Sequence, residues 1–107
     1  MKRTEPLSES YYYILLCLSK GANHGYGIMQ MTEQMSGGRV RLAAGTLYGA
    51  LSALCEKGWI IPLPFGEDSR KKEYKLTPVG QKVLKAELQR LQELVHNGET
   101  LLKEEEQ

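Results

Sequence analysis

The sequence predicts a mainly α-helical fold with a small β-wing, namely a winged helix-turn-helix followed by one long C-terminal helix. Residues 44–57 have apolar side chains at helical spacing on one face and small or hydroxylated side chains on the other. A β-like run, a polar turn and a basic second run follow over residues 59–76. From residue 84, apolar residues recur at alternating spacings of four and three. Helix, strand, polar tip and basic strand in this order are typical of a winged helix-turn-helix.

Length and charge distribution indicate one small domain with a single anion-facing surface. The chain has 107 residues and a formal net charge of +1, so it has the size of one domain and is not basic overall. Residues 36–75 nevertheless carry seven Lys or Arg against four acidic residues, whereas residues 81–107 carry four against six. This distribution favours an anionic partner for the middle of the chain.

Several classes of function lack their motifs in this sequence. Cys17 and Cys55 lie far apart, and His24 and His96 have no acidic partners at catalytic or metal-binding spacing. We interpret the cysteines as buried thiols in a reducing compartment, with redox sensing as the alternative. The sequence has no nucleophile elbow, paired carboxylates or phosphate loop, so we expect no catalytic residue, metal or cofactor. It also has neither an apolar run of the roughly 20 residues that a membrane span needs nor a signal-peptide core, so we expect no membrane contact and a cytoplasmic location.

The first two helices have clear boundary signals. Ser8 is the predicted N-cap of a first helix that runs to about residue 20. A second helix is expected over residues 24–35, with the glycine pair at 37 and 38 ending it. Residues 39–42 then alternate charged and apolar side chains, which predicts a short strand that pairs with the wing.

Thr77 and Pro78 mark the start of a last helix that reaches residue 103 or beyond, with Thr77 as N-cap. Its apolar seam is larger than packing against one small domain requires, which predicts a dimerisation helix. Gly98 interrupts the seam, and the sequence leaves open whether the helix continues through it. We therefore expect a winged-helix domain over residues 1–77 and a dimerisation helix over residues 78–107, joined as one compact unit. The predicted dimer interface comprises Leu84, Leu88, Leu91, Val95 and Leu102.

The polar face of the 44–57 helix is the predicted reading surface for double-stranded DNA. In a winged helix-turn-helix, this helix enters the major groove and phosphate contacts fix its register. Thr46 and Tyr48 are expected to bond phosphates, and the bare glycines would let the backbone come near. Since this face has no Arg, Asn or Gln, bidentate base readout is missing and specificity would rest on shape, van der Waals contacts and the wing. The predicted DNA-binding residues are Tyr26, Gly45, Thr46, Tyr48, Gly49, Ser52, Arg70, Lys71 and Lys72.

Two of these assignments have a structural alternative. Tyr48 could belong to the core, and a charge run such as residues 70–72 on an exposed hairpin is often only a solvated edge. The low net charge and the missing base-reading arginine also keep a second function open, a winged-helix module that binds another protein and not DNA. An enzyme is the least supported class, because the catalytic motifs are missing.

Five segments of the chain resemble the PadR family of bacterial transcriptional regulators. They are residues 7–10 (LSES), 24–28 (HGYGI), 45–48 (GTLY), 57–60 (KGWI) and 74–80 (YKLTPVG), in order along nearly the whole chain. The resemblance implies a homodimeric winged-helix repressor with an inducer site at or near the dimer interface. It also implies the short form of the family, in which the C-terminal part is one long helix.

The inducer site implied by the resemblance would lack the aromatic side chain that short members of the family often have on the last helix. Short members of the family bind flat hydrophobic molecules between subunits, often with an aromatic side chain on the last helix. Residues 79–107 contain no Phe, Tyr or Trp. The sequence is therefore as consistent with a small aliphatic ligand, or with no ligand, as with a flat aromatic one. The residues expected to line such a cavity are Tyr12, Ile14, Leu88, Leu91 and Val95.

Overall fold

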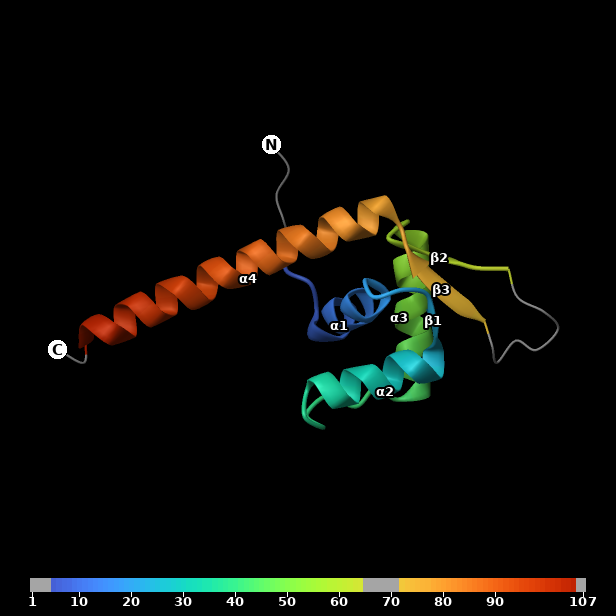
Figure 1. Ribbon diagram of the computed structural model, residues 1–107, viewed down its shortest axis with the longest axis horizontal. Coiled ribbons are helices and arrows are strands. Elements are labelled where there is room, and N and C mark those ends of the chain that lie inside the picture. The colour runs from blue at the N-terminus through green and yellow to red at the C-terminus, as the bar shows by residue number, and fades with distance from the viewer. Residues whose placement is uncertain (1–4, 65–71, 106–107) are drawn as a thin grey trace.

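The computed structural model describes residues 5–64 and 72–105. A helical body with a small sheet on one side carries a long last helix that extends well beyond it (Figure 1). The elements in chain order are α1 (Glu9–Leu18), β1 (Asn23–His24), α2 (Gly25–Met35), α3 (Ala44–Glu56), β2 (Ile60–Pro62), β3 (Glu73–Leu76) and α4 (Pro78–Glu105). The predicted fold, mainly α-helical with a β-wing and a long C-terminal helix, is confirmed. Among the described helices, none combines the length and the apolar character that crossing a membrane requires.

Side-chain caps set the beginnings of α1 and α2. Ser8 lies in extended backbone, and its Oγ accepts a hydrogen bond from the Tyr11 amide at 3.1 Å, as expected for an N-cap. His24 caps α2 in the same way through Nδ1, which accepts from the Gly27 amide at 3.0 Å. Beyond the other end of α2, Gly38 adopts a φ of +83°, a left-handed conformation that glycine reaches without strain. Both helices begin within a residue of their predicted positions.

The third strand of the sheet is not where the sequence pattern placed it. Residues 39–42 form no strand, so that prediction is wrong. The Val40 amide donates instead to the Ser36 hydroxyl at 2.9 Å, which satisfies the backbone locally. The third strand is β1, which pairs antiparallel with β3 so that Asn23 lies opposite Tyr74. Because β2 pairs with the other edge of β3, the strand order is β1-β3-β2.

One hydrophobic core joins α1, α2, α3, the sheet and the first turns of α4. Cys17 is buried in it, and burial raises the pKa of its thiol, so the group stays protonated at neutral pH. Cys55 is half-buried, and both cysteines are free thiols. The core residues are Ile14, Leu15, Cys17, Leu18, Ile28, Leu42, Leu47, Ala50, Leu51, Leu54, Ile60, Tyr74 and Leu84.

A single residue, Thr77, separates β3 from α4. Its Oγ1 accepts from the Gly80 amide at 3.0 Å, which confirms the predicted N-cap, and donates to the Gly58 carbonyl at 2.7 Å. Gly80 lies so close to the backbone of Trp59 that a Cβ at this position would overlap the Trp59 carbonyl oxygen. The start of α4 is therefore held firmly against the segment that follows α3.

Helix α4 is continuous through Gly98, which settles the question that the sequence left open. Its first part belongs to the body, since Leu84 is buried in the core and Leu91 is half-buried. Residues 92–104 are all exposed, and this part of α4 projects away from the rest of the chain (Figure 1).

Candidate nucleic-acid interface

Helix α3 turns one face to the core and the other to solvent. Leu47, Leu51 and Leu54 are completely buried, which fixes the rotation of the helix. None of the exposed residues of α3 is Arg, Lys, Asn or Gln. The exposed face carries all the residues predicted on this helix, namely Gly45, Thr46, Tyr48, Gly49 and Ser52.

Tyr48 is partly a packing residue and partly an accessible one. Its side chain leans over the N-terminus of α2, because a Cβ on Gly25 would lie 2.8 Å from the Tyr48 hydroxyl oxygen. Half of Tyr48 is nevertheless exposed, so it is not a core residue. The residue after Gly25 is Tyr26, which is 65% exposed. The structure thus brings these two predicted tyrosines to the same helix terminus.

Gly45 and Gly49 leave two positions on the exposed face of α3 bare, that is, without a side chain. A Cβ at either position would meet no atom within 4 Å, and neither residue has a positive φ. At Gly49, in the interior of α3, glycine costs about 1 kcal/mol relative to alanine, whereas Gly45 lies in the first turn. The fold of the free chain gains nothing in return, so these positions suit a surface that a partner's atoms approach closely.

The N-terminus of α3 lacks the side-chain cap that the other described helices have. Ser8, His24 and Thr77 each accept a hydrogen bond from the first turn of the helix that follows. The N-cap of α3 is Ala43, which has no side-chain acceptor. The first amides of α3 are left without a cap, and such amides together with the helix dipole favour an anion at this end.

The base of the wing lies against α3. Lys72 Nζ stands 5.7 Å from the centre of the Tyr74 ring. Burial raises the pKa of the Tyr74 phenol, and the nearby Cys55 of α3 adds to the rise. Burial also raises the pKa of the Cys55 thiol, while Lys72 partly offsets it. A positive charge therefore lies close to α3, whereas Arg70 and Lys71, the other predicted wing cations, are outside the described residues.

Arg41 is an exposed cation near α3 that sequence reasoning did not assign. It lies in the connection between α2 and α3, with its Nε 3.7 Å from the Glu33 carboxylate. Arg41 and Tyr26 both line an open cleft of about 540 Å³ beside α2. Arg39, in the same connection, donates two hydrogen bonds to Glu9, which hold the pKa of that carboxyl below its usual value. The alternation in residues 39–42 was the available signal, but it marks a connection that exposes its two arginines and buries Leu42, and not a strand.

The residues predicted for a dimer interface lie in different settings. Leu88, Val95 and Leu102 are exposed, and Leu91 is half-buried. Leu84 is only 7% exposed, because it packs into the core of its own chain. Little of its surface is left for a partner.

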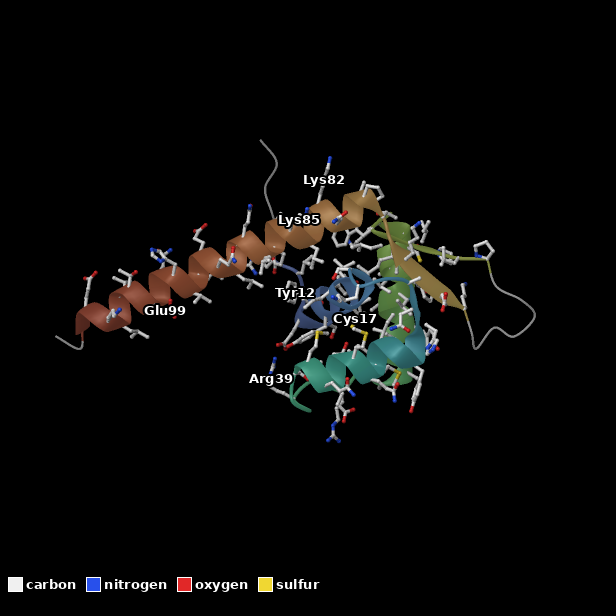
Figure 2. All side chains as sticks on the ribbon, viewed as in Figure 1. Tyr12, Cys17, Arg39, Lys82, Lys85 and Glu99 are labelled. Carbon is white, nitrogen blue, oxygen red and sulfur yellow. The ribbon has the colours of Figure 1, made fainter. Side chains whose placement is uncertain are left out.

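Two of the residues predicted for a ligand cavity share a cleft between α1 and α4. Tyr12 and Leu91 line this opening of about 310 Å³, and Figure 2 shows Tyr12 on the side of α1 that faces α4. Ile14 does not line it, since its side chain is completely buried in the core. Leu88 and Val95 also lie outside the lining. The remaining lining residues are Leu7, Glu9, Tyr13, Glu87 and Arg90.

Comparison with known proteins assigns this chain to a family. Residues 14–86 match the family described as "Transcriptional regulator PadR-like family". A PadR family transcription regulator from Clostridium difficile R20291 superimposes with a TM-score of 0.71 at 24% identity, covering 89% of this chain and 99% of that one. Bacillus subtilis PadR in complex with operator DNA superimposes with a TM-score of 0.62 at 30% identity, covering 73% of this chain and 45% of that one.

A further relative was found by sequence comparison. An uncharacterized 37.1 kDa protein in transposon TN4556 of Streptomyces fradiae is 39% identical over 80 residues, which is 75% of this chain but only 22% of that protein. The family match covers more than half of the present chain and includes α2, α3, the wing strands and the start of α4. The chain therefore belongs to the PadR-like family of transcriptional regulators.

Proposed function

We propose that this chain is a homodimeric cytoplasmic repressor that binds an inverted-repeat operator in double-stranded DNA. Residues 1–77 would form the reading head and residues 78–107 the dimerisation helix. The observation that carries the proposal is the bare, exposed face of α3 around Gly49, which the fold itself does not need. The operator DNA bound by Bacillus subtilis PadR supports the same class of partner.

Helix α3 is the proposed reading element in the major groove. Its two bare glycines allow the backbone to come within van der Waals distance of base edges, and Thr46 and Ser52 offer hydroxyls to bases or phosphates. Without an exposed Arg, Asn or Gln on α3, the bidentate contacts that specify guanine or adenine are not available from this helix. Sequence preference would then come mainly from shape and deformability of the operator.

Phosphate contacts are proposed around the edges of this surface. The uncapped first turn of α3 favours an anion, and the exposed residues Tyr26 and Tyr48 lie beside it. Arg41 on one side and Lys72 on the other add positive charge. We assign Arg70 and Lys71 to the wing contacts on the basis of the sequence.

A second copy of the chain is the proposed occupant of the projecting part of α4. The exposed apolar residues there recur at coiled-coil spacing, and a lone helix with such a seam is not stable in water. Pairing two copies would cover the seam and present two α3 helices to one face of the duplex, with half-sites about 10 bp apart. The residues proposed to make this contact are Leu88, Leu91, Leu94, Val95, Leu101 and Leu102.

A small hydrophobic inducer is the proposed release signal. The cleft that Tyr12 and Leu91 line lies next to the exposed seam of α4, and its lining combines apolar and aromatic side chains with the charged groups of Glu9, Glu87 and Arg90. A ligand held there between subunits would favour a dimer in which the α3 helices are spaced differently, and it would lower operator affinity by that difference.

Selection of bound sequences from random duplex DNA tests the proposal most directly. We expect an inverted repeat, and an affinity that falls steeply with salt, because each neutralised phosphate contributes about −0.9 to the log–log slope. Random sequences without symmetry, or no retention on DNA at low salt, would exclude the operator and favour the alternative of a protein-binding winged-helix module.

A further inference from the structure

Glu87 is a buried carboxylate at the point where α4 leaves the body. It is 2% exposed, although it lies on a helix whose neighbouring polar residues face solvent. Its Oε1 accepts a hydrogen bond from Arg90 Nε, and its Oε2 accepts one from an Arg90 guanidinium nitrogen, both at 2.8 Å. Oε2 also accepts from the Leu7 amide at 3.1 Å. We call Glu87, Arg90 and the Leu7 amide the exit clasp.

The exit clasp joins α4 to a segment far away in the sequence. Leu7 directly precedes Ser8, the N-cap of α1, so the clasp links α4 to the beginning of α1. Leu84 is the last deeply buried apolar residue of α4, Leu91 is half-buried, and every residue from 92 to 104 is exposed. Among the described residues, the bond from the Leu7 amide to Glu87 is therefore the last hydrogen bond between α4 and the body.

Hydrogen bonds restrict the direction in which α4 leaves the body more than apolar contacts do. Glu87 and Arg90 lie three residues apart on α4, so their forked ion pair holds the Glu87 carboxylate in one orientation within the helix. The hydrogen bond from the Leu7 amide then ties this oriented carboxylate to the segment that precedes α1. The bonds from Arg90 hold the pKa of the Glu87 carboxyl below its usual value despite burial, so the charged, fully bonded form persists at neutral pH.

Because the projecting part of α4 is long, a small change in the angle of the helix at the clasp moves its far end by a large distance. From residue 91 to residue 105 the helix rises about 21 Å, so a tilt of about 10° moves its far end by about 4 Å. One base pair advances along DNA by about 3.4 Å. In a dimer joined through α4, a small change of angle at the clasp is thus comparable to a one-base-pair change in the distance between half-sites.

We propose that Glu87 is a positioning residue that sets the angle between α4 and the reading head, and through it the half-site spacing that the dimer accepts. The inference rests on the proposed function for its DNA part. The angle itself is a property of the chain alone and is tested separately.

Glu87→Gln is the first test variant, because it keeps the size of the side chain and an acceptor for Leu7 but removes the charge that Arg90 faces. Arg90→Lys is the second, since it keeps the charge and loses the fork. Glu99→Gln is the matched control, the same chemical change on the projecting part of α4, where Figure 2 shows Glu99 far from the body. Circular dichroism is used to check that each variant is folded.

The DNA measurement uses a series of inverted repeats that differ by single base pairs between half-sites. Wild type and Glu99→Gln are expected to bind the repeat with the preferred spacing about tenfold more tightly than the repeats that are one base pair longer or shorter. Glu87→Gln and Arg90→Lys should flatten this preference or move it by one base pair. The same preferred spacing with uniformly weaker binding would overturn the inference.

The angle measurement needs no DNA. Spin labels at Gln34 on α2 and His96 on α4, both exposed, report the distance between the body and the projecting helix in the full chain. The labelled protein carries Cys55→Ser and is diluted with unlabelled chain, so that distances within one chain dominate. The clasp variants should broaden or shift the distance distribution, and Glu99→Gln should not. An unchanged distribution overturns the positioning role, whereas a changed distribution in a protein that binds no DNA would leave that role standing and refute the proposed function.

Discussion

Replacing Gly49 by alanine should stabilise the protein and weaken its binding to DNA. The position lies in the middle of α3, it is exposed, and a Cβ there meets no atom of the chain within 4 Å. The methyl group therefore adds helix propensity without a steric cost in the free protein. We expect a gain of about 1 kcal/mol in the free energy of unfolding, which corresponds to a rise in Tm of about 4 °C for a chain of this size.

On DNA the same methyl group should act in the opposite direction. If the backbone of α3 approaches base edges within van der Waals distance, the added carbon must push the helix outward. Overpacking of a tight contact costs about 1–3 kcal/mol, so the operator affinity should fall by about 5- to 150-fold. Thermal unfolding followed by circular dichroism measures the first effect, and fluorescence anisotropy with the selected operator measures the second.

Gly98 provides the matched control within the same chain. It too lies in the interior of a helix, and a Cβ there meets no atom of its own chain within 4 Å. Because Gly98 lies on the seam proposed to pair two chains, its effect on dimer formation is separated from its effect on DNA binding by the protein concentration. Gly98→Ala should raise Tm to a similar degree and leave operator affinity unchanged at protein concentrations that saturate the dimer. Unchanged operator affinity in Gly49→Ala would refute the close approach of α3, and a lower Tm would refute the reasoning about the empty space around Gly49.

Three further predictions concern the junction, the clasp and the wing. Gly80→Ala should destabilise the chain by about 1–3 kcal/mol in urea unfolding, because the added Cβ overlaps the Trp59 carbonyl and backbone must move; an unchanged midpoint would contradict this. Since the folded-state pKa of Glu87 is lowered, its contribution to stability is present above the unfolded value of about 4.3 and is lost as the pH falls through the folded value. Urea unfolding from pH 7 down to pH 3 should therefore show the stability advantage of wild type over Glu87→Gln shrinking with acid, and a constant difference would count against the ion pair. Lys72→Ala should reduce the salt dependence of DNA binding by about one phosphate contact while leaving sequence preference intact, and an unaltered slope in a salt titration would remove Lys72 from the interface.

The parts of the fold that follow from local signals could be predicted from the sequence. Ser8 and Thr77 act as caps where their hydroxyls precede helical patterns, and Gly38 lies past the end of α2 where a left-handed residue is needed. The exposed face of α3 also follows directly from the spacing of its leucines. In each case the physical cause lies within a few residues of the effect.

The parts that depend on distant contacts could not be predicted in this way. A two-residue strand such as β1 has no pattern of its own, and it exists because β3 offers it a free edge. In the sequence Leu84 is part of the apolar seam of α4, but in the fold it is buried by its own chain and is not available to a partner. Glu87 looks like an ordinary helix-surface acid until the Leu7 amide, 80 residues earlier, is placed beside it.

The immediate passage from β3 into α4 has a practical consequence for protein engineering. Because a single residue separates the two and Gly80 and Leu84 are built into the body, the reading head has no natural cutting point at residue 77. A fragment that stops there would lose part of its own interior. Fusing this head to a foreign dimer-forming module would require keeping α4 as far as Leu91, roughly four helical turns, and splicing beyond it.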